Sequence, residues 1–143
     1  MKPVDQTVFT VPGGNCFSAC VATLLELPLD RVPYFMGDFD EPDGVWWERF
    51  ARWLAPHGFY PLNFGCPPNG DWYPRGEYIL SAGSPRGDFD HSVVAIGREI
   101  VHDPHPSRAG LVRREKQEAT IFVPISYARC AGPISNVQPG KTE

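Results

Sequence analysis

The hydrophobic pattern of this 143-residue chain changes its period near residue 58. Before that point, apolar residues recur at helical spacing in two segments, residues 16–27 and a second segment that ends near residues 57–58. After it, short runs of β-forming residues alternate with Gly, Pro, Asn and Asp. Helices followed by strands indicate an α+β domain with an antiparallel sheet rather than alternating βαβ units. The predicted strands span residues 59–64, 77–82, 91–97, 99–103 and 119–125.

The composition is that of one folded domain. With 42% hydrophobic residues the chain can build its own core, and we expect residues 1–131 to form a single domain and residues 132–143 a mobile tail. The formal net charge of -4 argues against nucleic acid or an anionic membrane as the main partner. The first residues lack the apolar core of a signal peptide, and no run approaches the ~18 apolar residues of a membrane span. These features predict a cytoplasmic protein.

The two predicted helices differ in their surfaces. Residues 16–27 are apolar on nearly all sides, so this helix should be central and buried. The second helix is predicted to have Asp43 as its N-cap and to end at His57, which we expect to cap the last carbonyls. One of its faces is aromatic, and packing against the sheet explains this face better than a ligand platform does. That face is formed by Trp46, Phe50, Trp53 and Leu54.

Cys16 is the strongest candidate for a chemical role. It follows a turn formed by Gly13, Gly14 and Asn15, and it opens the first predicted helix. Unpaired N–H groups and the positive end of the helix macrodipole stabilise a thiolate at that position. Cys16 is therefore a candidate nucleophile. Four cysteines are too few for a disulfide scaffold, and we expect the other three to be reduced, buried residues; they are Cys20, Cys66 and Cys130.

A cysteine nucleophile needs a base, and His91 is the best placed histidine. It opens the predicted strand 91–97, and the strand that follows ends at Asp103. A hairpin whose odd-membered loop centres on Gly97 would place His91 directly opposite Asp103, whose carboxylate would fix the imidazole tautomer. A two-residue loop would instead send the two side chains to opposite faces. The pairing therefore requires a three-residue loop or a β-bulge.

Hydrolysis through a thioester also requires an oxyanion hole. The backbone N–H of Cys16 is one donor, and an upstream amide side chain is the usual second donor. Gln6 and Asn15 are the candidates, and for Asn15 we favour the role of helix N-cap. Gln6 lies ten residues before Cys16, far enough for the glycine turn to bring it back beside the thiol.

The order Gln6, Cys16, His91 and Asp103 resembles that of the papain-like cysteine peptidases, especially the compact bacterial branch that includes the bacteriocin-leader-processing peptidases. The matching segments are Gln6 and residues 14–20, 91–94 and 102–104. The resemblance implies a Cys-bearing helix packed on an antiparallel sheet that supplies the His and the Asp. It also implies that Gln6 is the oxyanion-hole donor, Cys16 the nucleophile, His91 the general base and acid, and Asp103 the residue that orients His91.

The implied activity is that of a cysteine hydrolase that cleaves a peptide or isopeptide bond in a peptide or protein substrate, without a metal or organic cofactor. Two other readings keep the fold. The domain could bind a peptide or partner protein without catalysis, or the same triad could perform acyl transfer or amide hydrolysis on another substrate. A further alternative is a metal site. Its ligands would be His102, Asp103, His105 and a cysteine.

Several loop residues are expected to lie near the site. We favour His102 and His105 as polar loop residues near the mouth of the site, where they, like Asn15, are candidates for contact with substrate. A short strand is predicted at residues 7–10. Three loops are expected to border the cleft and to favour basic or apolar groups. They comprise residues 36–44, 65–76 and 84–90.

Overall fold

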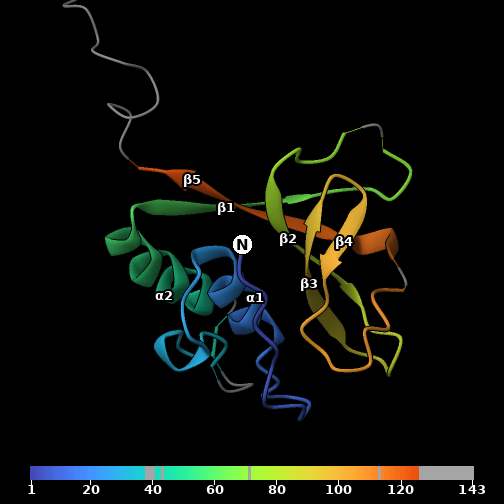
Figure 1. The fold of residues 1–143 in the computed structure, drawn as a ribbon, viewed down its shortest axis with the longest axis horizontal. Helices are drawn as coiled ribbons and strands as arrows, with labels where there is room; N and C mark the ends of the chain where they lie inside the picture. Colours follow the sequence, from blue (N-terminus) through green and yellow to red (C-terminus); the bar gives the residue numbers. More distant parts are fainter. Residues whose placement is uncertain (38–40, 43, 71, 113, 126–143) are drawn as a thin grey trace, which may run out of the picture.

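The computed structural model describes residues 1–37, 41–42, 44–70, 72–112 and 114–125. Within these ranges two α-helices precede a five-stranded sheet, which confirms the predicted α+β class (Figure 1). The helices are α1 (Cys16–Leu25) and α2 (Val45–Leu54). The strands are β1 (Phe59–Gly65), β2 (Glu77–Gly83), β3 (Asp90–Ile96), β4 (Glu99–His102) and β5 (Glu118–Pro124). Short 3-10 helices span Leu29–Arg31, Ala55–His57 and Arg114–Lys116.

The sheet has the strand order β1-β5-β2-β3-β4, and each neighbouring pair is antiparallel. Each of the five strands predicted after residue 58 is found, with both ends within one residue of the expected positions. Glycine, proline, asparagine and aspartate between the strands account for this agreement, because these residues favour turns and disfavour strand interiors. β1 and β4 form the two edges of the sheet.

Both helices cover one face of the sheet (Figure 1), and the larger core lies between the helices and this face. Residues 17–23 of α1 are all buried, as the apolar surface of this segment predicts. α2 buries Phe50 and Leu54, and its tryptophans pack against the same cluster. The ring centroid of Phe50 lies 5.1 Å from that of Phe17 on α1 and 5.9 Å from that of Phe122 on β5. The aromatic face of α2 therefore packs inward, as predicted.

The opposite face of the sheet carries a smaller core. It is formed by alternate residues of β2, β3 and β5 together with the buried Cys66. Tyr73, in the connection between β1 and β2, packs on this core, and the guanidinium of Arg98 lies 4.6 Å from the centre of its ring. The described part of the connection 65–76 therefore covers the far face of the sheet. It does not line the cleft beside Cys16, so this part of the loop prediction is wrong.

The ends of the helices differ from the prediction in detail. α1 ends at Leu25 rather than at residue 27, because Glu26 adopts the left-handed conformation with φ 55 and turns the chain. α2 is followed by the turn of 3-10 helix, and Nδ1 of His57 donates to the Trp53 carbonyl at 3.1 Å. The predicted capping role of His57 is thus confirmed. The residue before α2 is Gly44, and the proposed N-cap Asp43 lies outside the described residues.

Two other predictions have different outcomes. Residues 7–10 form no strand; instead, this segment is bound to α1 through the side chain of Asn15, as described below. The predicted mobile tail, residues 132–143, and Cys130 lie outside the described residues. Among the described residues, no helix has both the length and the apolar character needed to cross a lipid bilayer.

Candidate functional site

Cys16 is the first residue of α1, and its side chain is partly exposed with a free thiol. The helix therefore presents its unpaired N–H groups to the sulfur, as the sequence predicts. Asn15 occupies the N-cap position, but its side chain makes no capping hydrogen bond. Its Oδ1 instead accepts the backbone N–H groups of Thr7 and Val8, at 3.0 and 2.9 Å. The capping interpretation of Asn15 is wrong, because its side chain binds the N-terminal segment to the start of α1.

The hairpin that carries the other two candidate residues contains a β-bulge. A two-residue turn, Gly97-Arg98, joins β3 to β4, with Gly97 at φ 57. Beyond the first two pairs the strands slip by one residue, which leaves Val101 without a partner. The paired residues are Ile96 and Glu99, Ala95 and Ile100, and then Val94 and His102.

The bulge decides on which side of the hairpin Asp103 lies. With the two-residue turn alone, Asp103 would stand opposite Ser92, and its side chain would face away from His91. The extra residue moves Asp103 toward Val93, on the same side as His91. The prediction that His91 and Asp103 stand directly opposite each other is therefore wrong by two residues. Their side chains nevertheless meet, with Nε2 of His91 2.8 Å from Oδ1 of Asp103.

Asp103 is buried, and both of its carboxylate oxygens are occupied. Besides the His91 imidazole, it accepts the backbone N–H of His105 at 2.9 Å and that of Gly110 at 2.8 Å. Burial raises the pKa of this carboxyl, but the three hydrogen bonds outweigh burial and lower the pKa to about 2. Asp103 is therefore an anion at neutral pH, and its orientation is fixed from three sides.

Cys16 and His91 line the same cleft, and their pKa values move in opposite directions. Desolvation raises the pKa of Cys16, but the hydrogen bond and charge of His91, with the N–H groups of Ser92 and Phe17, lower it overall. Desolvation lowers the pKa of His91, and its hydrogen bonds to Asp103 and Cys16 more than reverse this. Since Nε2 of His91 faces Asp103, Nδ1 is the nitrogen left for the thiol. Both shifts favour a thiolate beside an imidazolium.

Gln6 lines the same cleft as Cys16 and is buried. Its Nε2 donates one hydrogen to the Val8 carbonyl at 3.0 Å, so the second amide hydrogen remains for a group in the cleft. Its Oε1 is buried and has no hydrogen-bond partner among the described residues. The amide is thus held beside Cys16 by the segment that Asn15 fixes, which is the placement that the glycine turn was expected to allow.

The cleft beside Cys16 has a volume of about 380 Å³ and a largely apolar lining. Phe9 and Phe89 contribute aromatic rings, and Arg86 and Asp90 contribute charges of opposite sign. Of the predicted loops, 36–44 contributes Met36 and 84–90 contributes Arg86, Phe89 and Asp90. The sequence does not predict Phe9 as a lining residue, because its neighbours are typical of a β-strand and predict one at residues 7–10.

The histidines in the segment after β4 separate in the structure. His105 lines the cleft, and its ring centroid lies 5.3 Å from that of Phe9 and 6.3 Å from that of His91. The backbone N–H of Ser107 donates to Nδ1 of His105 at 3.0 Å, which places the ring hydrogen on Nε2. Desolvation and the charge of Arg86 lower the pKa of His105, so this ring is neutral at pH 7.

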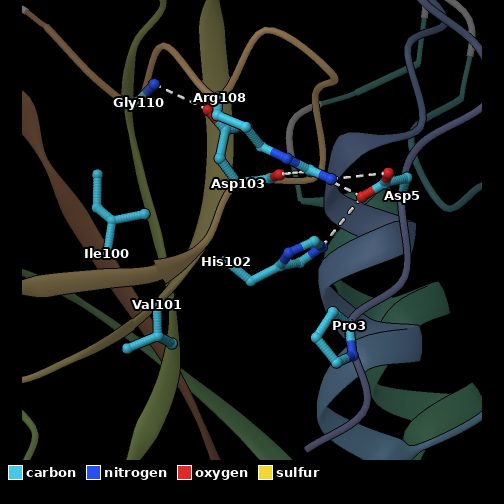
Figure 2. A pocket seen from close by; sticks show the side chains of 8 residues that line it. All are labelled: Pro3, Asp5, Ile100, Val101, His102, Asp103, Arg108 and Gly110. Atoms are coloured by element: carbon cyan, nitrogen blue, oxygen red, sulfur yellow. Dashed lines mark hydrogen bonds and ion pairs between the residues drawn. The ribbon is translucent and has the colours of Figure 1, made fainter.

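His102 is buried and ends β4, so the prediction that it is a loop residue at the mouth of the cleft is wrong. Its Nε2 donates to the Val4 carbonyl at 2.8 Å. His102 also lines a second cavity, away from Cys16, which Figure 2 shows. Among the described residues, no group of three or more His, Cys, Asp or Glu side chains is arranged to hold a metal ion. His102, Asp103 and His105 do not converge on one point, which contradicts the metal-site alternative for these three residues.

Comparison of the chain with protein-family models, with curated proteins and with solved structures finds no match.

Proposed function

We propose that this chain is a papain-like cysteine hydrolase that cleaves a peptide or isopeptide bond through a thioester. The observation that supports the proposal is the 2.8 Å hydrogen bond between His91 and the buried Asp103, in the cleft that Cys16 lines, where His91 also lowers the pKa of Cys16. A helix that begins at the nucleophile and an antiparallel sheet that carries the base have the arrangement that the resemblance implies.

In the proposed reaction the Cys16 thiolate attacks the carbonyl carbon, and the carbonyl oxygen becomes an oxyanion. The backbone N–H of Cys16 and the free amide hydrogen of Gln6 stabilise this charge. His91 then gives its proton to the leaving amine and later takes a proton from the water that cleaves the thioester. Asp103 remains ionised throughout and keeps Nδ1 of His91 directed at the sulfur.

The lining of the cleft favours a substrate with an apolar side chain near the scissile bond. Phe9, Tyr34 and Phe89 offer aromatic surface, and Phe9 and Tyr34 are 51% and 44% exposed. Burial of such rings by a substrate residue removes apolar area from water, which is the main source of affinity in clefts of this kind.

Iodoacetamide labelling near pH 6, followed by site-resolved mass spectrometry, tests the proposal. At that pH a thiol of ordinary pKa is almost wholly protonated, so we expect Cys16 to be labelled at least about tenfold faster than the other cysteines. His91→Gln, which keeps a polar side chain at a buried position, should abolish the difference. His57→Gln is the matched control, because His57 caps the end of the α2 segment and should leave labelling unchanged. If all cysteines are labelled slowly, and at the same rate in wild type and in His91→Gln, the proposal is contradicted and a binding module is favoured.

A further inference from the structure

The two ends of the candidate site come from distant parts of the chain, and a set of hydrogen bonds joins them. Gln6 lies in the N-terminal segment, and Asp103 follows β4. The backbone N–H of Gln6 donates to the Pro104 carbonyl at 3.0 Å, and His102 donates to the carbonyl of Val4. These contacts align residues 4–6 with residues 102–104 along one side of the site.

Two side chains reach Asp5 in the N-terminal segment from the other side, as Figure 2 shows: Arg108, and His102, whose Nε2 lies 3.5 Å from Oδ1 of Asp5. The guanidinium of Arg108 binds the carboxylate of Asp5 in a bidentate manner, with distances of 2.7 and 2.9 Å. The same group donates to the backbone carbonyl of Asp103. A single planar cation therefore contacts the residue before Gln6 and the residue that orients His91.

The backbone at Arg108 is shaped for this role. Its φ of 51 lies in the left-handed region, which is costly for a residue with a Cβ atom. This conformation turns the loop back, so that the N–H of Gly110 reaches Oδ2 of Asp103 at 2.8 Å. Glycine or asparagine would adopt it at lower cost, so the side chain of Arg108 is the feature that distinguishes this position.

We infer that Arg108 is a positioning residue, which binds Asp5 and the Asp103 carbonyl together and thereby sets the Gln6 amide and the Asp103 carboxylate at the correct separation around Cys16 and His91. The inference rests on the proposed function. Arg108 does not line the Cys16 cleft, so it acts through its neighbours rather than on substrate. A planar guanidinium can donate to three acceptors in fixed directions, whereas the ammonium of lysine cannot reproduce this geometry.

The side chains of Arg108 and Asp5 are each 49% exposed, and this separates positioning from general stability. Exposed ion pairs contribute little to the stability of a fold. A displacement of about 1 Å at a reacting group, in contrast, can change a rate by up to about 100-fold. Loss of Arg108 should therefore affect the chemistry of the site far more than the melting temperature.

The test compares wild type, Arg108→Ala and Arg108→Lys, with Arg52→Ala on the exposed side of α2 as the matched control. Two rates are measured from pH 5 to 9: alkylation of Cys16 by iodoacetamide and hydrolysis of p-nitrophenyl acetate. In Arg108→Ala we expect ester hydrolysis to fall about tenfold or more, and the apparent pKa of Cys16 to rise toward that of a free thiol. Arg108→Lys should recover only part of the lost activity. Arg52→Ala should behave as wild type in both rates. Thermal unfolding, followed in all four proteins, should change little.

The outcomes distinguish the inference from the proposed function. If wild-type Cys16 reacts fast in a His91-dependent manner and Arg108→Ala matches it in both rates, the positioning role is wrong and the proposed function stands. If Arg108→Lys restores both rates fully, charge alone is sufficient and the geometric role is wrong. If wild-type Cys16 behaves as an ordinary thiol, both fail. Asp5→Asn provides a second variant that keeps the cation, and it should shift both rates in the same direction as Arg108→Ala.

Discussion

Cys16 and His91 each shift the pKa of the other toward the charged form. The thiol is desolvated, which by itself would keep it protonated, and the imidazole is desolvated, which by itself would keep it neutral. The interaction between the two side chains opposes both effects, and the hydrogen bond to Asp103 raises the pKa of His91 further. The two pKa values therefore move toward each other, which favours a thiolate–imidazolium pair. Hydrolysis in the proposed mechanism should fall at low pH, where the thiol is protonated, and at high pH, where the imidazole has no proton for the leaving group.

Asn15 provides a prediction at the scale of single residues. Asn15→Ala removes the acceptor for the N–H groups of Thr7 and Val8, and this should lower the free energy of unfolding by about 1 kcal/mol. Hydrolysis of p-nitrophenyl acetate should also fall, because Val8 holds the Gln6 amide. Urea denaturation and initial rates measure the two effects.

Asn15→Ser distinguishes this role from that of a helix cap. Serine is a good N-cap, but its side chain is too short to bind both backbone N–H groups. We expect Asn15→Ser to resemble Asn15→Ala. Full recovery of stability and rate by serine would show that capping of α1, and not the bound N-terminal segment, is the important contribution.

At the scale of elements, the strands were the easiest features to predict, and the contacts that build the site were the hardest. Turn-forming residues delimit each strand, so their ends fall within one residue of the prediction. The early end of α1 could not be predicted, because Glu26 enters the left-handed region without glycine or asparagine to indicate it. The contact between His91 and Asp103 could be predicted only on the condition that the hairpin contains a three-residue loop or a bulge. Nothing in the local pattern places that bulge at Val101.

The bulge itself gives a prediction that belongs to this scale. Deletion of Val101 removes the extra residue and leaves a regular two-residue hairpin, in which Val94 still pairs with His102 and Asp103 stays on the side of His91. Cys16 should then be labelled by iodoacetamide at pH 6 at about the wild-type rate. Deletion of both Ile100 and Val101 would place Asp103 opposite Val94, so that its side chain faces away from His91, and Cys16 should be labelled as slowly as an ordinary thiol. Fast labelling of the double deletion would mean that the register of the hairpin does not set the position of Asp103.

At the scale of the whole molecule, the site depends on contacts between the first residues and the segment after β4. Arg108 and Asp5 are separated by 103 positions in the chain, and His102 and Val4 by 98. Periodicity and spacing describe neighbours in sequence, so they could indicate Gln6 and Asp103 as candidates but not the residues that join them. The ion pair is also formed by two common surface residue types, which carry no signal of their own.

Acid unfolding provides the prediction at this scale. The pKa of Asp103 is about 2 in the folded protein and 3.8 for a free aspartate, so its ionised form stabilises the fold by about 2 kcal/mol above pH 4. That contribution is lost as the pH falls from 4 through 2, and only below about pH 2 is the carboxyl protonated in both states. In Asp103→Asn it is absent at every pH. The difference in free energy of unfolding between wild type and Asp103→Asn, measured by urea denaturation, should therefore decrease over this interval.

The matched control for acid unfolding is Asp30→Asn, in an exposed 3-10 turn, which should follow wild type at each pH. The raised pKa of His91 acts at higher pH. The protonated imidazole stabilises the fold fully below pH 6.5, and this contribution is lost as the pH rises through the pKa of His91 in the folded protein. Wild type should therefore be most stable between about pH 4 and the folded-state pKa of His91. If the difference between wild type and Asp103→Asn stays constant from pH 5 to 2, the Asp103 carboxylate contributes packing or hydrogen bonds but no net ionic stabilisation. The ionic connection between Asp103 and His91 would then be too weak to hold a thiolate–imidazolium pair at Cys16.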